Sequence, residues 1–276
     1  MRLAYDEAGA GELVVLLHGF PLSRRMWSEQ LRGLSARYRV VAPDLRGHGE
    51  TPVADGVATM EAMADDVLEL VDQLGVRDRF VLGGLSMGGY VALAFARRHP
   101  ERLRGLILLD TRAAADTPEA AMTRVKTAQV VLAMGVTTVV DSMLPRLFGQ
   151  PALVHHLDRV QAIKSIMERT RPEGVAAALK GMACRADSRP ELARISVPTL
   201  VLVGDVDVIT PPAESELMAR SIPGARLAVI PGAGHMAPVE EPEIVNQVLL
   251  DFLGVLSSAP GSAHSSVPVP ESAVRS

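Results

Sequence analysis

The pentapeptide Gly84-Leu85-Ser86-Met87-Gly88 lies between an apolar run that begins at Phe80 and a stretch of small residues typical of a helix start. It fits the pattern G-x-S-x-G, which suits a sharp turn from a strand into a helix. Gly84 and Gly88 leave room for strand and helix to approach closely, while Ser86 is exposed at a strained apex. The N-terminus of the following helix stabilises negative charge at the same point. The pattern therefore predicts a reactive serine at the end of a buried strand.

Short apolar runs alternate with helical patterns along most of the chain. Uninterrupted runs such as Leu13–Leu17 are typical of strands buried on both faces of a parallel sheet. The predicted strands cover residues 13–17, 38–42, 80–82, 106–109, 197–203 and 226–230. The predicted helices cover residues 28–36, the segment from a Thr59 cap to Gly75, the segment from Ser86 to just before Pro100, and residues 212–221 and 240–253. In the second of these helices Asp66 is assigned to the outward, polar face. This alternation predicts an α/β fold with a doubly wound, mainly parallel sheet.

One long segment does not follow this alternation. Residues 111–189 contain helical stretches broken by prolines and no strand-like run, which predicts an inserted helical cap. The core is then formed by residues 1–110 and 190–256. Residues 257–276 are rich in Ser, Pro and Ala without periodicity, and we expect a disordered C-terminal tail with no catalytic role.

Composition excludes several functional classes. The net charge is −4 and no basic stripe with interleaved aromatic residues is present, so nucleic acid is not an expected partner. No apolar run approaches the roughly 18 residues of a membrane span. Cys184 is the single cysteine, so no intrachain disulfide can form, and the acidic N-terminal residues do not resemble a signal peptide. We expect a cytoplasmic protein, whose oligomeric state the sequence leaves unknown.

Chemically active side chains follow the predicted strands, one after another. In a parallel sheet the carboxyl ends of the strands form the edge where ligands bind. The residues just beyond a strand end are His18, Gly19, Asp44, Ser86, Asp110, Asp207 and His235. Their shared position at one edge predicts a single active site there.

A serine hydroxyl needs a general base, usually a histidine oriented by a carboxylate. The histidines after Ser86 are His99, His155, His156, His235 and His264. Among them, only His235 follows a predicted core strand, in a loop flanked by glycines. For the carboxylate we favour Asp207, which follows a strand between Ser86 and His235. Asp110, and after it Asp205, remain alternatives.

Acyl transfer also requires hydrogen-bond donors for the developing oxyanion. We expect one donor to be the backbone N–H of Met87, the residue after the nucleophile. The other is expected from the loop after the first buried strand, where the backbone N–H of Phe20 is the candidate.

Other polar residues in these loops have structural explanations. We interpret His18 as a buried histidine that bonds loop backbone, and Asp44, Arg46 and His48 as an ion-paired brace within their loop. The adjacent His155 and His156 point in different directions on a helix, and no Cys/His/Asp set has metal-ligand spacing, so no metal is expected.

Taken together, these segments resemble the α/β-hydrolase superfamily over roughly residues 3 to 254. The matching landmarks are residues 18–21, 44–49, 84–88, 204–207 with 210–212, and 232–235. The core is similar to the bacterial 3-oxoadipate enol-lactonase and small carboxylesterase branch. That resemblance implies a cap over the site, formed by the insert, and no cofactor. Haloalkane dehalogenases and epoxide hydrolases use an aspartate as nucleophile, so Ser86 argues against both.

The expected function is hydrolysis of small carboxylic esters or lactones through Ser86, His235 and Asp207 by way of an acyl-enzyme. Two alternatives remain open. One is cofactor-free perhydrolase or haloperoxidase activity with the same triad. The other is a non-catalytic small-molecule receptor on the same scaffold, since fold alone does not determine function.

Overall fold

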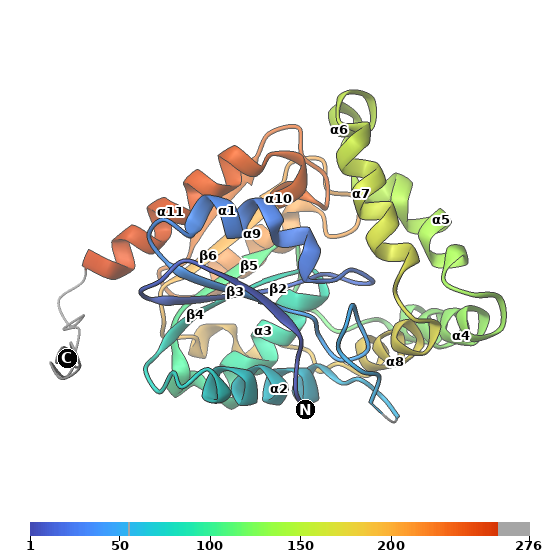
Figure 1. The fold of residues 1–276 in the computed structure, drawn as a ribbon, viewed down its shortest axis with the longest axis horizontal. Coiled ribbons are helices and arrows are strands. Elements are labelled where there is room, and N and C mark those ends of the chain that lie inside the picture. Colours follow the sequence, from blue (N-terminus) through green and yellow to red (C-terminus); the bar gives the residue numbers. More distant parts are fainter. Residues whose placement is uncertain (55, 259–276) are drawn as a thin grey trace, which may run out of the picture.

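The computed structural model describes residues 1–54 and 56–258, and within them the apolar runs form one seven-stranded sheet (Figure 1). The strand order is β1-β3-β2-β4-β5-β6-β7, and in this sheet β1 alone runs antiparallel to its neighbour. The strands are β1 (Tyr5–Ala8), β2 (Leu13–Leu17), β3 (Arg39–Pro43), β4 (Phe80–Leu85), β5 (Leu103–Leu109), β6 (Thr199–Gly204) and β7 (Arg226–Ile230). The predicted parallel sheet is confirmed.

The central strands are apolar because both of their faces are covered. Every residue of β2, β4 and β6 is buried, as expected for strands between two layers of helices. The sequence did not predict β1, whose residues are half-buried or exposed at the sheet edge. An edge strand has only one neighbour, so it does not require the apolar run by which the other strands are recognised.

Helices cover both faces of the sheet (Figure 1). On one face α1 (Ser28–Leu34) packs against α11 (Pro242–Ser258), and on the other α2 (Met60–Gln73) packs against α3 (Met87–Arg98). The remaining core helices are α9 (Pro212–Ser221), which packs on β6 and β7, and the short α10 (Ala237–Glu240). This doubly wound arrangement also matches the prediction.

Helix α2 shows where the sequence pattern succeeds and where it fails. The Thr59 side chain accepts a hydrogen bond of 3.1 Å from the N–H of Ala62, and Gly75 follows the helix with a φ of 75°, as predicted. The assignment of Asp66 to the outward face is wrong, because this residue is buried. Its carboxylate pairs with Arg46 at 2.6 Å and with the Met1 ammonium at 3.0 Å, and these cations compensate its loss of water.

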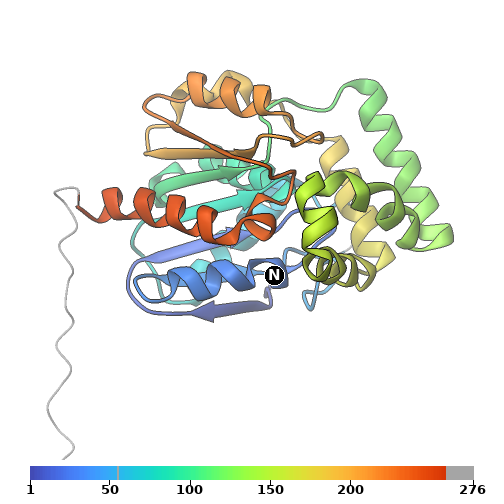
Figure 2. The same cartoon turned by 90° about the horizontal axis from the view of Figure 1, so that it is seen from above.

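A helical insert, defined here as α4 to α8, connects β5 to β6 and gathers at one end of the molecule (Figures 1 and 2). Its helices are α4 (Pro118–Met134), α5 (Thr137–Leu147), α6 (Gln150–His155), α7 (Leu157–Glu168) and α8 (Pro172–Ala183). Thr170 donates a hydrogen bond of 2.9 Å to the carbonyl of Pro21, and the N–H of Ala58 donates one of 3.2 Å to the carbonyl of Ala177. The insert therefore contacts loops that follow β2 and β3 at their carboxyl ends.

The C-terminal helix extends further than predicted. Helix α11 continues to Ser258, so residues 257 and 258 are helical and do not belong to the proposed tail. The rest of that tail, residues 259–276, lies outside the described residues. None of the helices within residues 1–54 and 56–258 is long and apolar enough to cross a lipid bilayer.

Candidate active site

Ser86 occupies the turn between β4 and α3 with a φ of 53° and a ψ of −111°. A positive φ is strained for a residue that carries a side chain, so the surroundings must hold it. The Ser86 N–H donates to the carbonyl of Leu109 at 3.0 Å, and the Ser86 carbonyl accepts from the Thr111 hydroxyl at 2.8 Å. The end of β5 and the residues after it therefore fix the strained turn from the neighbouring strand.

The two glycines of the pentapeptide are required by close backbone contacts. A Cβ added at Gly84 would collide with the carbonyl of Gly88 across the turn. A Cβ at Gly88 would collide with the carbonyl of Leu17 and lie 2.9 Å from that of His18. Because any side chain would force these backbones apart, both positions are restricted to glycine by the packing of β4, α3 and the end of β2.

The Ser86 side chain is partly exposed, and its hydroxyl has no hydrogen-bond partner within the described residues. The loop after β2 passes directly beside it, since a Cβ placed on Gly19 would lie 3.5 Å from the Ser86 Cβ. This loop continues into Phe20, which is buried. The predicted nucleophile and the predicted donor loop are therefore neighbours.

The backbone N–H groups of Phe20 and Met87 have no acceptor in the part of the chain that the structure describes. Met87 is the first residue of α3, and N–H groups in the first turn of a helix have no partner within the helix. Neither group therefore has a partner among the described residues, and their role as oxyanion donors stays a prediction.

His235 and Asp207 form a buried pair, with His235 Nδ1 lying 2.8 Å from Asp207 Oδ2. A carboxylate only accepts hydrogen bonds, so Nδ1 carries the proton and Nε2 remains an acceptor. Burial acts to raise the pKa of Asp207, but the hydrogen bond and charge of His235 and the bonds from Thr210 outweigh it, and the pKa falls below its ordinary value. Asp207 is therefore held in its ionised form.

The two alternative carboxylates have other partners. The first, Asp110, is fully buried, and its Oδ1 accepts a bond of 2.8 Å from the N–H of Gly204. The second, Asp205, accepts a bond of 2.7 Å from the N–H of Gly232. Among the described contacts neither carboxylate bonds His235, so the structure brings Asp207 alone of the three to this histidine.

Ser86 and His235 lie at the same edge of the sheet. Ser86 follows β4 and Asp207 follows β6, with β5 between them, and adjacent strands are about 4.8 Å apart. The two strand ends are therefore about 10 Å apart, and His235 projects from beyond β7 toward Asp207. No hydrogen bond joins Ser86 to His235 within the described residues, so transfer of a proton between them stays a prediction.

His18 and His48 are both buried and lie 5.1 Å apart between ring centroids. His18 Nδ1 lies 2.8 Å from the Gly19 carbonyl, and its Nε2 accepts from the N–H of Leu45 at 2.9 Å. Burial lowers the pKa of His18 to about 4 and, with His18 adding to the effect, lowers that of His48 to about 3. The interpretation of His18 as a structural residue agrees with these contacts.

The predicted brace of Asp44, Arg46 and His48 has the wrong partners. The Asp44 carboxylate pairs with Arg24, from the loop after β2, and Arg46 pairs with Asp66 of α2. His48 is uncharged and bonds the carbonyl of Arg46 through Nδ1 at 3.1 Å. These pairs join separate parts of the chain, which spacing within one loop cannot reveal.

Two residues contact the pair of Asp207 and His235 or its loop, and the sequence pattern did not predict this role for either. The Thr210 hydroxyl donates to Asp207 Oδ2 at 2.7 Å and lies 3.3 Å from His235 Nδ1. Glu240 is buried and accepts backbone hydrogen bonds on both sides of His235. The short spacing from Asp207 to Thr210 is a signal that could have identified the threonine, because an aspartate in a turn often bonds the backbone two residues on and so lies beside the residues that follow.

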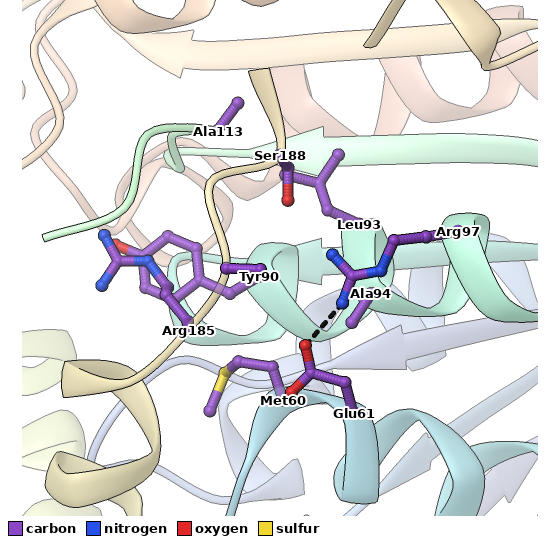
Figure 3. A pocket seen from close by; sticks show the side chains of 10 residues that line it. Met60, Glu61, Tyr90, Leu93, Ala94, Arg97, Ala113, Arg185 and Ser188 are labelled. Atoms are coloured by element: carbon purple, nitrogen blue, oxygen red, sulfur yellow. Dashed lines mark hydrogen bonds and ion pairs between the residues drawn. The ribbon is translucent and has the colours of Figure 1, made fainter. Parts of the chain in front are cut away.

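Cavities of different sizes lie near the insert, and two of them bear on where a substrate could sit. The small pocket in Figure 3, between Met60, Tyr90 and Arg185, has a volume of about 10 Å³. That is room for about one water molecule, so it cannot hold a substrate. A second cavity of about 430 Å³ lies between Ser23 and Asp44 of the core and the insert helix α7 with Thr170. No cluster of three or more potential metal ligands occurs among the described residues.

Known proteins resemble this chain over most of its length. The 3-oxoadipate enol-lactonase 1 of Acinetobacter baylyi is 30% identical over 240 residues, which cover 87% of this chain and 88% of that protein. A thermophilic esterase from Thermogutta terrifontis, solved with malate bound, superimposes with a TM-score of 0.91 at 50% identity, covering 92% of this chain and 93% of the other. The enol-lactonase from Burkholderia xenovorans LB400 gives a TM-score of 0.85 at 32% identity, covering 91% and 96%.

The family comparison agrees with these individual relatives. Residues 14–248 match the family model described as the alpha/beta hydrolase family. This range includes the elbow at Ser86, the helical insert and the pair of Asp207 with His235. The fold, the serine elbow and the extent of the match together show that the chain belongs to the alpha/beta hydrolase family.

Proposed function

We propose that this protein is a serine hydrolase that cleaves carboxylic esters or lactones of small molecules, with Ser86 as nucleophile, His235 as general base and Asp207 as its orienting carboxylate. The observation that carries the proposal is the buried pair of His235 Nδ1 and Asp207 Oδ2, 2.8 Å apart, at the sheet edge where Ser86 stands on a strained turn. Relatives of this chain are an esterase and two enol-lactonases, which supports this class of substrate.

In the first half of the reaction, His235 Nε2 takes the proton of the Ser86 hydroxyl while Ser86 Oγ attacks the carbonyl carbon of the substrate. The imidazolium formed in this way is stabilised by the ionised Asp207, whose second oxygen is held by the N–H groups of Ile209 and Thr210 at 2.7 and 3.0 Å. Because these bonds exist before the substrate arrives, the carboxylate needs no rearrangement during proton transfer.

The negative charge of the tetrahedral intermediate develops on the former carbonyl oxygen. The free N–H groups of Phe20 and Met87 would bond this oxygen, and the N-terminal end of α3 adds a favourable field. In support of this role, the loop carrying Phe20 passes beside Ser86 at Gly19. A single donor of this kind contributes about 10²- to 10³-fold to the rate.

The imidazolium of His235 then gives its proton to the leaving alkoxide, and the acyl-enzyme remains. In the second half, His235 takes a proton from the water molecule that attacks the acyl-enzyme and gives it to Ser86 Oγ as the bond between Oγ and the acyl carbon breaks. The products are a carboxylic acid and an alcohol from an ester, or one hydroxy or keto acid from a lactone. We also propose that the helical insert acts as the cap. In support of this role, the insert bonds the residue after Phe20 through Thr170 and Pro21, and it bonds the loop that carries His235 through Gly149 and Glu240.

The decisive experiment compares the wild-type protein with Ser86→Ala on an acyl-chain series of p-nitrophenyl esters and a panel of lactones. Removal of the nucleophile should lower kcat/KM by about 10⁴-fold or more. Ser142→Ala is a matched control, since Ser142 is an exposed serine whose hydroxyl bonds the Val139 carbonyl of its own helix. This control should retain wild-type activity.

A fluorophosphonate probe provides a second measurement. The probe should label the wild-type protein and Ser142→Ala at one site and leave Ser86→Ala unlabelled. Absence of labelling of the folded wild-type protein would favour the receptor alternative. Near-full ester or lactone hydrolysis by Ser86→Ala would overturn the assignment of the nucleophile.

A further inference from the structure

Glu240 is a buried carboxylate that lies five positions after His235 and bonds the loop on both sides of it. Its Oε1 accepts the N–H of Gly234 at 2.9 Å and that of Met236 at 3.1 Å. The side chain is almost completely buried. The two residues that flank His235 in the chain are therefore tied to one oxygen atom, which restricts the backbone that carries the imidazole.

The other oxygen of this carboxylate reaches the helical insert. Glu240 Oε2 accepts a hydrogen bond of 2.7 Å from the N–H of Gly149, the residue that precedes α6. Among the described residues no cation pairs with this carboxylate, so three backbone N–H groups are its stabilising partners. Burial raises the pKa of Glu240, the three bonds oppose that rise, and the nearby Asp207 charge adds to it.

The insert rests directly on the histidine loop at this point. A Cβ on Gly234 would lie 2.6 Å from the nitrogen of Gly149 and 2.7 Å from the carbonyl carbon of Phe148. A Cβ on Gly149 would collide with the carbonyl of Gly232. The backbones are therefore in contact without intervening side chains, and a displacement of residues 147–149 must displace the loop or break the bond to Glu240.

A second residue of the insert, Arg159, bonds the short helix α10, which ends at Glu240. Arg159 of α7 donates to the carbonyl of Glu240 at 2.6 Å and to that of Val239 at 3.3 Å, at the C-terminal end of α10. Carbonyls in the last turn of a helix have no partner within it, so this arginine satisfies two of them. The insert consequently holds both the side chain and the backbone of Glu240.

We propose that Glu240 is a positioning residue that fixes His235 through the N–H groups of Gly234 and Met236 and makes this position depend on the seating of the insert at Gly149. The inference rests on the proposed function of His235. It adds a link between the part of the chain expected to select the substrate and the base expected to act on Ser86.

The primary test is Glu240→Gln, which keeps the size of the side chain. An amide has one acceptor oxygen, and its NH₂ group would face a backbone donor that it cannot bond. We expect kcat to fall by about 10- to 100-fold with KM changed by less than about threefold, because substrate contacts are retained while the base is misplaced. Glu241→Gln is the matched control, since it removes the same charge one residue further on and should retain wild-type kcat.

Gly149→Ala tests the same link from the insert side, and it also serves if Glu240→Gln does not fold. Its methyl group would push the insert away from the Gly232 carbonyl and lower kcat in the same way. The double variant should lose less activity than the product of the two single losses, because both changes act through one contact. Independent, multiplicative losses would contradict the link.

Amide hydrogen exchange provides a readout that is independent of catalysis. In Glu240→Gln the N–H groups of Gly149, Gly234 and Met236 should exchange faster than in the wild-type protein, while the sheet remains protected. Faster exchange with unchanged kcat would overturn the positioning role. If Ser86→Ala retained activity, the proposed function would fail instead, and the exchange result would be unaffected by that failure.

Discussion

Asp110 bonds the backbone N–H of Gly204 through one carboxylate oxygen at 2.8 Å, and its other oxygen has no partner within the described residues. The residue is fully buried at the end of β5 with a φ of 42°. Burial, and to a smaller extent the charges of Asp207 and Glu240, raise the pKa of Asp110 well above its ordinary value. The Asp110 carboxyl group therefore keeps its proton to a higher pH in the folded protein than in the unfolded chain.

Replacement of Asp110 by Asn should remove one contribution to stability that falls as the pH rises. The pKa is raised in the folded protein, so the folded state binds more protons than the unfolded state once the pH exceeds the ordinary carboxyl value of about 4. The stability advantage of Asp110→Asn over the wild-type protein should therefore grow as the pH rises from about 4, by up to about 1.4 kcal/mol per unit. Urea unfolding between pH 4 and 8 measures it, and a difference that does not vary with pH would contradict the expectation.

Asp207→Asn should lower kcat by about 10⁴-fold. The amide favours the wrong tautomer of His235, and it carries no charge that could stabilise the imidazolium. Asp110→Asn, by contrast, should lower kcat by less than about tenfold, since Asp110 bonds Gly204 and no bond joins it to the histidine among the described contacts. Steady-state hydrolysis of one ester by the two variants separates the candidates. A larger loss at Asp110 would assign it as the orienting carboxylate.

Thr210→Val should weaken the support of Asp207 while preserving the shape of the side chain. The lost hydroxyl bond of 2.7 Å should cost about 1 kcal/mol of stability and raise the pKa of Asp207, since that bond helps to lower it. A carboxylate whose pKa is lowered by folding stabilises the folded protein at pH values above its unfolded pKa. This stabilisation is lost as the pH falls through the folded pKa. The stability lost in Thr210→Val should therefore be largest above about pH 4 and shrink as the pH falls below it, whereas Thr210→Ser should keep wild-type stability; urea unfolding between about pH 3 and 7 measures both.

Gly88→Ala should destabilise the elbow by about 3 kcal/mol or more, because its Cβ would overlap the Leu17 carbonyl, a backbone atom that cannot rotate away. Gly254→Ala is the matched control on α11, where no atom lies within 4 Å of the added Cβ. That control should be more stable than the wild-type protein by about 0.5 to 1 kcal/mol. Equal stability of the two variants, measured by denaturant unfolding, would argue against the packing role of Gly88.

The sheet could be predicted because its central strands are recognisable without knowledge of their neighbours. Runs such as Leu13–Leu17 are apolar at every position, and only burial on both faces requires that. The glycines at 84 and 88 identified the elbow in the same local manner. Strand β1 carries no such pattern, because at an edge the residues Asp6 and Glu7 can remain in contact with solvent.

The partners of charged residues could not be predicted, because they depend on distances across the fold. The Arg24 guanidinium reaches Asp44 from another loop, and Asp66 turns inward because Arg46 and the N-terminus are there to pair with it. Glu240 is a similar case. Nothing in the local pattern distinguishes it from Glu241, yet one carboxylate is buried against three N–H groups and the other is not.

The position of the insert between β5 and β6 has a consequence for folding. Leu109 of β5 pairs with Leu202 of β6 although about 90 residues separate them, and closing a loop of that length costs about 2 kcal/mol more than closing one of ten residues. Ser86 precedes this long closure, whereas Asp207 and His235 follow it. A chain that has formed β1 to β5 alone therefore contains the proposed nucleophile without its base. Recovery of ester hydrolysis during refolding should report the joining of the two halves of the sheet, later than the appearance of secondary structure.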